Sequence, residues 1–239
     1  IIPGGAFRRL VYNFEGEDVA KWLNSMGIAA FVLECRLPSD EHDNAEDVPL
    51  IDAMRAMRVI RGRAQEFGID EAKIGVMGFS AGGFMAALLS TAYESDVYAD
   101  YKYKDEYDKL SARPDFAVCS YPVISIDDCI EAGKRYMSEE QVLERISDSK
   151  AKILHKYNPD KLVRPDMPPV FICETDDDRT TLSENSVGFY MAARKAGVSA
   201  ELHIFRTGGH GYGCGDDFAQ TGEWKVLFTK WIKSIGIIS

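Results

Sequence analysis

The most constraining feature of the sequence is a Gly-x-Ser-x-Gly turn, Gly78-Phe79-Ser80-Ala81-Gly82, between an apolar stretch and a helix-forming stretch. The apolar stretch, residues 73–79, is short and does not alternate with polar residues, which is typical of a strand buried on both faces of a parallel sheet. Residues 83–90 are rich in Ala, Leu and Met and predict a helix. A strand, a strained serine turn and a helix form a nucleophile elbow, because the flanking glycines let the turn lift the hydroxyl into a cleft. We therefore predict Ser80 to be a nucleophile.

Strands and helices alternate along most of the chain. Helices are predicted over residues 16–26, 46–67, 83–90, 182–196 and 221–235, and strands over residues 28–35, 73–79, 116–121, 170–175 and 200–205. This alternation implies an α/β fold with a mostly parallel, doubly wound sheet and helices on both faces. In such sheets the ligand site lies beyond the carboxyl ends of the strands.

Between about residues 122 and 168 the alternation is replaced by polar helical segments, such as residues 138–146 and 150–156. An insertion at this point of the chain is where a small helical cap or lid over a substrate cleft is expected. The length of 239 residues suits one large α/β core, and no interdomain linker is visible. We predict a single domain over residues 1–239 that carries this cap.

The chain begins on Ile1-Ile2, followed at once by Pro3. This is typical of the end of a strand, so we expect the N-terminal strands of the domain to be missing. An export signal would then be missing as well, and the compartment stays open. The five cysteines are odd in number and several fall in predicted strands, which favours buried thiols over disulfides and slightly favours the cytoplasm.

The composition argues against several kinds of partner. The net charge is −10, with 38 acidic and 28 basic residues, so the chain lacks the basic face that nucleic acid requires. No apolar run approaches the roughly 18 residues of a membrane span. No Cys-x-x-Cys or His/Cys cluster suggests zinc, and we expect neither a metal nor an organic cofactor. The sequence does not indicate an oligomeric state.

A serine nucleophile needs a base within hydrogen-bond reach. Of the four histidines, His42 falls in a loop and His155 in the cap, where surface positions are expected, and His203 lies in a predicted buried strand, where a core histidine is expected. His210 lies in a glycine-rich loop, residues 207–213, directly after the last strand. Such permissive backbone lets a side chain approach the serine, so we predict His210 to be the base.

The base in turn needs a carboxylate to orient it. Three adjacent acids, Asp176, Asp177 and Asp178, follow the strand predicted over residues 170–175. One of them is expected to act in a triad of chain order Ser, acid, His. Spacing alone does not choose among the three.

A series of short motifs runs through nearly the whole chain. They are Pro3-Gly4-Gly5-Ala6, Glu17-Asp18-Val19-Ala20-Lys21-Trp22-Leu23, Gly27-Ile28-Ala29-Ala30-Phe31-Val32-Leu33, Gly78-Phe79-Ser80-Ala81-Gly82-Gly83, Tyr121-Pro122-Val123-Ile124, Asp177-Asp178, Asn185-Ser186 and Gly208-Gly209-His210-Gly211. In these motifs the chain resembles the α/β-hydrolase esterases of the acetyl xylan esterase and bifunctional feruloyl/acetyl esterase type. The resemblance weakens between about residues 125 and 161. It implies an α/β-hydrolase fold.

The resemblance also implies which acid acts. Members of the family carry an acid pair a few residues before an Asn-Ser that opens the next helix. Matching backwards from Asn185-Ser186 places the catalytic acid on Asp178, with Asp177 as the alternative.

The same match implies an oxyanion hole made by the backbone N–H groups of Gly5, Ala6 and Ala81. The loss of one such donor can raise the barrier by roughly 3 kcal/mol. The sequence departs from the family where Ala6 replaces glycine, where Glu174 stands at a position that is often histidine, and where residues 180–182 replace a more apolar segment.

The resemblance implies a serine carboxylic-ester hydrolase that removes a small acyl group from a sugar hydroxyl, with acetylated xylan or its oligosaccharides as the leading substrate. A peptidase of the prolyl oligopeptidase type, a general small-ester carboxylesterase and a formamidase are the alternatives. A non-catalytic binding module is disfavoured, because Ser80, an acid and His210 are all present. Tyr98, Tyr101 and Tyr103 are able to stack on sugars, but packing on their own domain is the stronger expectation.

Overall fold

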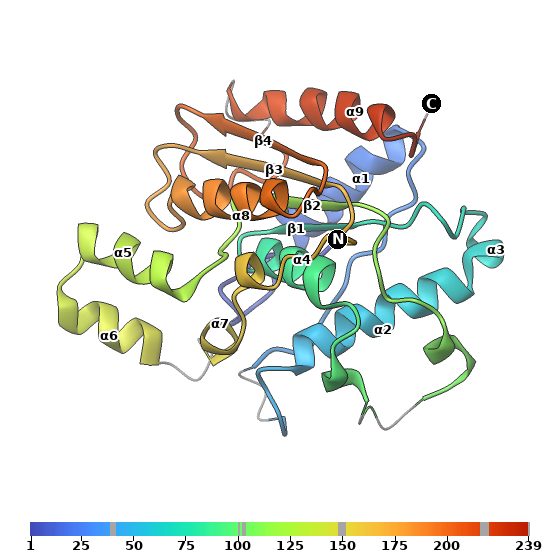
Figure 1. Ribbon diagram of the computed structural model, residues 1–239. Helices are drawn as coiled ribbons and strands as arrows, with labels where there is room; N and C mark the ends of the chain where they lie inside the picture. Colours follow the sequence, from blue (N-terminus) through green and yellow to red (C-terminus); the bar gives the residue numbers. More distant parts are fainter. Residues whose placement is uncertain (39–41, 100, 102–103, 148–151, 216–219, 239) are drawn as a thin grey trace.

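The centre of the structure is a parallel β-sheet. The computed structural model describes residues 1–38, 42–99, 101, 104–147, 152–215 and 220–238 (Figure 1). The strands lie in the spatial order β1 (Val76–Phe79), β2 (Ala117–Ser120), β3 (Val170–Thr175) and β4 (Ala200–Phe205), and each neighbouring pair is parallel. The predicted parallel sheet is therefore confirmed.

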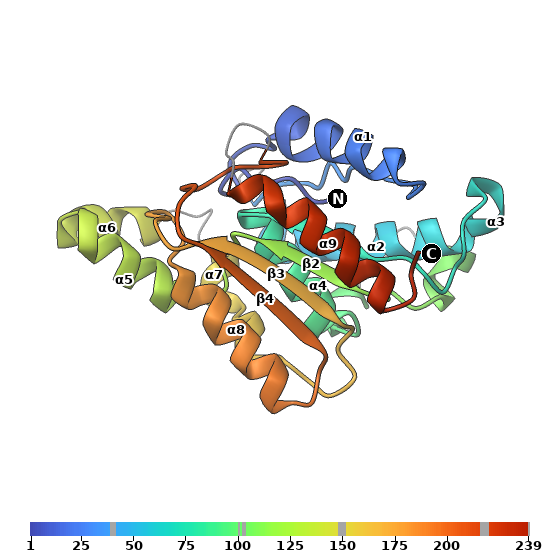
Figure 2. The same ribbon diagram turned by 90° about the horizontal axis from the view of Figure 1, so that it is seen from above.

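Helices cover both faces of this sheet. α1 (Asp18–Ser25) and α9 (Trp224–Ser234) lie over one face, and α2 (Val48–Gly62), α4 (Ala81–Ala92) and α8 (Ser183–Lys195) lie over the other (Figure 2). Val170 and Ile172 of β3 belong to the core cluster of α2, α4 and α8, whereas Phe171 and Cys173 belong to that of α1 and α9. β1, β2 and β3 are largely apolar because both of their faces are buried.

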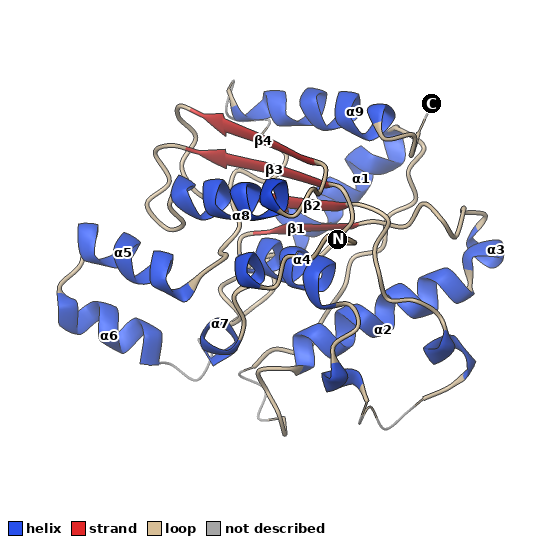
Figure 3. Ribbon diagram, in the orientation of Figure 1, coloured by secondary structure: helices blue, strands red, loops and turns tan. Residues whose placement is uncertain are grey.

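The remaining helices connect these layers (Figure 3). They are the π-helix η1 (Asn13–Glu17), α3 (Ala64–Phe67), α5 (Ile126–Tyr136), α6 (Glu139–Ser147), α7 (Lys152–Lys156), and the short 3₁₀ helices η2 (Asp96–Tyr98), η3 (Glu106–Lys109), η5 (Pro159–Lys161) and η6 (Thr221–Glu223). α5 and α6 form a pair at one end of the molecule, in the stretch predicted to be the cap (Figures 1 and 2). Residues 150–151 of the helix predicted over 150–156 lie outside the described residues.

The prediction of a strand over residues 28–35 is wrong. This segment is extended, but only two backbone hydrogen bonds attach it to the N-terminal residues, from Ile1 N to Phe31 O (2.7 Å) and from Leu33 N to Ile1 O (2.9 Å). Ile2 in turn forms a single parallel bridge to Gly78 of β1. A strand needs a neighbouring strand that is long enough to form a ladder of hydrogen bonds. Here both bonds are made by one residue, Ile1.

The prediction of one helix over residues 46–67 is also wrong in detail. The helix divides into α2 and α3 at Arg63, where the backbone leaves helical geometry (φ −106°, ψ 16°). Gly62, a weak helix former, immediately precedes this break.

His203 does not lie in a buried strand as predicted. It belongs to β4, which is one of the two edge strands among those described, and its side chain is 25% exposed and bonds through Nε2 to Glu201 Oε1 (2.7 Å). The other described strands, including the opposite edge strand β1, are buried throughout, whereas every residue of β4 is at least partly exposed.

The tyrosine-rich stretch packs on its own domain where it is described. Tyr98 is buried, donates a hydrogen bond to Asp108 and stacks on Tyr101, with ring centroids 5.1 Å apart. The guanidinium of Arg58 lies 4.1 Å from the Tyr98 ring centroid. Tyr103 lies outside the described residues.

The five cysteines all lie in the described part of the chain, and no disulfide joins any two of them. Four are buried and Cys129 is partly exposed. None of the helices in the described ranges has the length and apolar character needed to cross a bilayer. Within those same ranges, no group of three or more His, Cys, Asp or Glu side chains is arranged to hold a metal ion.

The close approach of β1 to α4 makes a testable prediction. A Cβ on Gly78 would lie 1.9 Å from the carbonyl oxygen of Gly82, whereas a Cβ on Gly188 of α8 would meet nothing within 4 Å. We expect Gly78→Ala to destabilise the fold by about 3 kcal/mol or more. Gly188→Ala, the matched control, should stabilise it by about 0.5–1 kcal/mol, because alanine is the better helix former. Chemical denaturation measures both values, and a Gly78→Ala variant of unchanged stability would contradict the packing described.

Candidate active site

Ser80 lies at the sharp turn between β1 and α4. Its backbone has φ 53° and ψ −118°, a strained conformation for a residue with a side chain. The turn is held by hydrogen bonds from Ser80 N to Ser120 O on β2 and from Phe84 N to Ser80 O, both 3.0 Å. The strand-turn-helix geometry expected from the glycine pattern is therefore present.

The side chains of Ser80, His210 and Asp178 form one hydrogen-bonded line. Ser80 Oγ lies 2.8 Å from His210 Nε2, and His210 Nδ1 lies 2.6 Å from Asp178 Oδ2. The three residues come from the end of β1, the loop after β3 and the loop after β4, which meet at the carboxyl edge of the sheet. A hydroxyl next to an imidazole that is oriented by a carboxylate is the arrangement that activates serine for attack.

Asp178 is buried and well supplied with hydrogen-bond donors. Its Oδ1 accepts from Thr180 N (2.7 Å) and Thr181 N (3.0 Å), and its Oδ2 accepts from Thr181 Oγ1 (2.9 Å). Burial acts to raise the pKa of Asp178, but the bonds from His210, Thr181 and Thr180 outweigh it, and the pKa lies below its ordinary value. Asp178 is therefore a carboxylate that faces His210.

The two neighbouring acids have different contacts. Asp177 Oδ1 accepts hydrogen bonds from Gly208 N (2.9 Å) and Gly209 N (2.8 Å), so it anchors the backbone of the loop that carries His210. Asp176 Oδ1 accepts a long bond from Ser183 Oγ (3.4 Å). Of the three acids that sequence spacing left open, Asp178 is the one that bonds to the imidazole in the described structure.

Glu174 is a second acid behind Asp178, and the sequence singled it out only as a departure from the family. Its side chain is fully buried, with Oε1 accepting from Thr175 N (2.9 Å) and Oε2 from Ser186 Oγ (3.4 Å). Burial and the adjacent charge of Asp178, to which it is hydrogen-bonded, raise the pKa of Glu174 well above its ordinary value. Both effects favour the protonated form of Glu174 beside the ionised Asp178.

Two of the three expected oxyanion donors line the same cavity as Ser80. The cavity has a volume of about 460 Å³, and Ala6, Ser80 and Ala81 all form part of its wall. Ala81 is the first residue of α4, a position whose N–H has no partner within the helix. Ala6 adopts φ 56°, a left-handed conformation that glycine takes more readily than alanine. Gly5 belongs to the same turn but is not among the residues that line the cavity.

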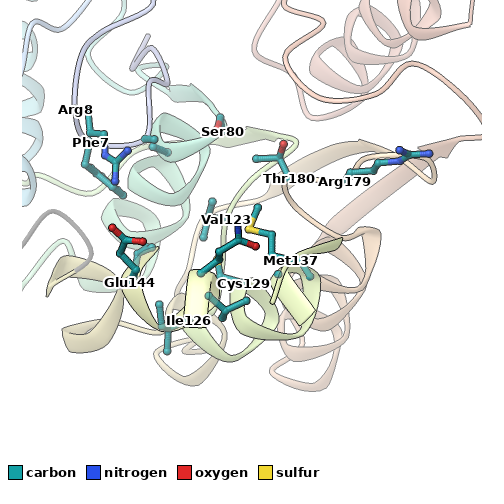
Figure 4. Close-up of a pocket in the computed structure, with 17 residues that line it drawn as sticks. Phe7, Arg8, Ser80, Val123, Ile126, Cys129, Met137, Glu144, Arg179 and Thr180 are labelled. Atoms are coloured by element: carbon teal, nitrogen blue, oxygen red, sulfur yellow. The ribbon is translucent and has the colours of Figure 1, made fainter. Parts of the chain in front are cut away.

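The cavity extends from Ser80 to the helices of the predicted cap (Figure 4). Its far wall is largely apolar and consists of Val123, Ile126, Cys129, Ala132, Gly133, Met137, Val142 and Leu154. Arg8 and Glu144 lie on one side of it and Thr180 and Arg179 on the other (Figure 4). His42 and His155 are not part of its lining, and His155 is exposed on α7.

A parallel α/β sheet with a serine elbow after one strand, an acid after a later strand and a histidine after the last is the arrangement of an α/β-hydrolase. The chain belongs to the BD-FAE family, whose model matches residues 1–192. The predicted fold and family are thereby confirmed.

Two curated relatives and two solved structures are similar to the chain. The chain is 31% identical to an acetylxylan esterase of Xylanibacter ruminicola, over 98% of its own length and 45% of that protein. It is also 31% identical to an endo-1,4-beta-xylanase B of Butyrivibrio fibrisolvens, over 91% of its own length and 32% of that protein. The chain therefore spans less than half the length of these relatives. An acetyl ester-xyloside bifunctional hydrolase from Caldicellulosiruptor lactoaceticus superposes with a TM-score of 0.81 at 37% identity, over all of this chain and 83% of the other. A propionate-bound esterase from Thermogutta terrifontis superposes with a TM-score of 0.77 at 25% sequence identity. The superposition covers all of this chain and 83% of that esterase.

The different contacts of Asp178 and Asp177 predict different losses on substitution. Asp178→Asn should lower kcat for p-nitrophenyl acetate by about 10³–10⁴-fold, because the imidazole loses the anion that orients it. Asp177→Asn keeps an oxygen for the Gly208 and Gly209 N–H groups and should cost less than about tenfold. Steady-state kinetics compares the two, and equal losses would show that the acid is not Asp178.

The buried proton of Glu174 predicts a pH-dependent stability difference. Because folding raises the pKa of Glu174 above 4.5, its protonated form contributes stability that is full below pH 4.5 and is lost as the pH rises toward the folded pKa. Glu174→Gln cannot ionise, so Tm of this variant should rise relative to the wild type as the pH is raised above 4.5 toward the folded pKa of Glu174. Glu184→Gln, which removes an exposed carboxyl whose pKa is lowered by Arg135, should show no trend over that range. A constant difference for Glu174→Gln would mean that Glu174 does not change its protonation there.

Proposed function

We propose that the chain is a serine carboxylic-ester hydrolase that works through an acyl-enzyme, with Ser80 as nucleophile, His210 as base and Asp178 as the acid that orients it. The observation that carries this proposal is the pair of hydrogen bonds from Ser80 Oγ to His210 Nε2 (2.8 Å) and from His210 Nδ1 to Asp178 Oδ2 (2.6 Å). Both lie in the range that a proton transfer requires.

In the first half of the reaction, Ser80 Oγ attacks the ester carbonyl carbon and its proton passes to His210 Nε2. The negative charge that develops on the carbonyl oxygen is held by the N–H groups of Gly5, Ala6 and Ala81. The ester bond then breaks, the alcohol leaves with the proton from His210, and the acyl group stays on Ser80.

In the second half, water attacks the acyl-enzyme while His210 takes its proton. The bond between the acyl group and Ser80 Oγ then breaks, His210 returns the proton to Ser80 Oγ, and the carboxylic acid leaves. Asp178 stays ionised and stabilises the imidazolium in both halves, in keeping with its lowered pKa. The raised pKa of Glu174 favours its neutral form, which avoids a second buried negative charge beside Asp178.

The proposed substrates are acetylated xylan, its oligosaccharides or related acetylated sugars. The named activities of the acetylxylan esterase and the acetyl ester-xyloside hydrolase support this choice. A cap over about residues 122–168 of a single domain would close the cavity above Ser80, since residues of α5, α6 and α7 line it.

A general small-ester carboxylesterase is the second candidate. The cavity of about 460 Å³ has a largely apolar far wall, which suits acyl groups longer than acetyl. Activity against simple esters of several acyl lengths, with little preference for a sugar leaving group, would favour this candidate over the first.

Covalent labelling and acetate release test the proposed function. A fluorophosphonate should label the folded protein at Ser80, and Ser80→Ala should abolish both labelling and turnover, with kcat lowered by about 10⁶-fold. The wild type should release acetate from acetylated xylo-oligosaccharides but should not cleave peptidyl-proline or formyl-amide substrates. Labelling without acetate release would retain the serine hydrolase and reject the sugar ester, and an unlabelled folded protein would reject the whole proposal.

A further inference from the structure

We propose that Glu15 is a positioning residue for two segments beside Ser80. One is the turn Pro3-Gly4-Gly5-Ala6, called the oxyanion turn below, and the other is the loop of residues 207–213 that carries His210, called the His210 loop. The inference rests on the proposed function, because it concerns the same site. Glu15 belongs to the π-helix η1, is 4% exposed, and takes no part in the hydrogen-bonded line of Ser80, His210 and Asp178. Single-turn π-helical segments are frequent at functional sites, and a buried charged group needs a role that offsets its desolvation.

One carboxylate oxygen of Glu15 holds the oxyanion turn. The N–H of Gly4, the residue before Gly5 and Ala6, donates to Glu15 Oε2 at 2.7 Å. A Cβ on Gly4 would lie 2.7 Å from that oxygen and 2.9 Å from Ser80 Cβ. Gly4 therefore lies close to both the carboxylate and the nucleophile, with no room for a side chain at its position.

The other oxygen of Glu15 holds the His210 loop through a tyrosine. The hydroxyl of Tyr121, a fully buried residue directly after β2, donates to Glu15 Oε1 at 2.8 Å and accepts from Gly213 N at 3.0 Å. Gly213 lies three positions after His210 in the sequence, and the Tyr121 ring packs edge to face on the imidazole, with centroids 5.0 Å apart. A chain of three hydrogen bonds thus runs from Gly4 to Gly213 in the loop that carries His210.

The direction of these bonds requires a carboxylate. Tyr121 has one proton, and since its hydroxyl accepts from Gly213 N, that proton goes to Glu15. Glu15 must accept at both oxygens, which an ionised carboxyl does and an amide cannot. Burial has the largest effect and leaves the pKa of Glu15 above its ordinary value, although the bonds from Tyr121 and Gly4 and the charge of His210 act to lower it.

The geometry also gives Glu15 an electrostatic part in the reaction. A buried negative charge near His210 stabilises the imidazolium that forms when Ser80 loses its proton. The same carboxylate keeps the Gly4 turn aimed at the carbonyl oxygen, so its removal should affect the transition state more than the binding of the ester.

Glu15→Gln tests the proposal because it keeps the shape and places an N–H₂ group against Gly4 N–H or Tyr121 O–H. We expect kcat for p-nitrophenyl acetate to fall by about 10²-fold with KM changed by less than about threefold. Inhibition by phenylboronic acid, which forms a tetrahedral adduct on serine, should weaken by a similar factor. Glu17→Gln is the matched control, since Glu17 is exposed in the same segment and pairs only with Lys21 in the described structure (3.7 Å), and it should behave as the wild type.

A second variant keeps the proposal testable if Glu15→Gln does not fold. Tyr121→Phe retains the ring against His210 but removes the link to Gly213, and it should lower kcat by about tenfold with unchanged KM. In the double variant the loss should be smaller than the product of the single losses, because both act through one chain of bonds.

Two results would overturn the inference while leaving the proposed function intact. One is a folded Glu15→Gln variant with wild-type kcat, and the other is a Tyr121→Phe variant with wild-type kcat when Glu15→Gln is unfolded. A wild-type protein that hydrolyses no ester would instead reject the proposed function.

Discussion

The contact between β1 and α4 at the serine turn is the constraint on which the rest of the site depends. The backbones of β1 and α4 approach so closely that a Cβ on Gly78 would lie 1.9 Å from the carbonyl oxygen of Gly82, and a Cβ on Gly82 would lie 1.9 Å from the carbonyl oxygen of Ile2 in the N-terminal segment. This approach forces Ser80 to φ 53° and points its hydroxyl out of the sheet edge. It also brings the N-terminal turn against the nucleophile, so that one packing contact sets the positions of the serine and of the proposed oxyanion donors.

The carboxyl groups around His210 show how burial and neighbours give one functional group different roles. Asp178 receives several donors and stays ionised, whereas Glu174, beside it but poorer in donors, keeps a proton. Asp177 stays at the surface and binds the backbone of the His210 loop. Glu15 accepts at both oxygens and links that loop to the turn before Ser80. These four acids are able to lie close to one site because each has its own hydrogen-bond partners.

Much of the fold could be predicted from the sequence, because strands buried on both faces and helices with one apolar face leave clear patterns. The failures occur where tertiary neighbours decide. Residues 28–35 have the composition of a buried strand, but the described chain offers them only the short segment at Ile1 to pair with. The residues next to His203 in the sequence are apolar and predict a buried strand. β4 nevertheless lies at an edge of the sheet, and the sequence of one strand does not show where that strand lies in the sheet.

The sequence by itself determined the residues whose chemistry depends on local geometry: Ser80 in its glycine turn and His210 in its glycine-rich loop. Only the tertiary structure decided which of three adjacent aspartates contacts the imidazole, and that Glu15 and Tyr121 join the turn to the loop. The reason is physical, since these choices depend on distances between groups 32 to 106 positions apart in the chain, and local patterns carry no information about such distances.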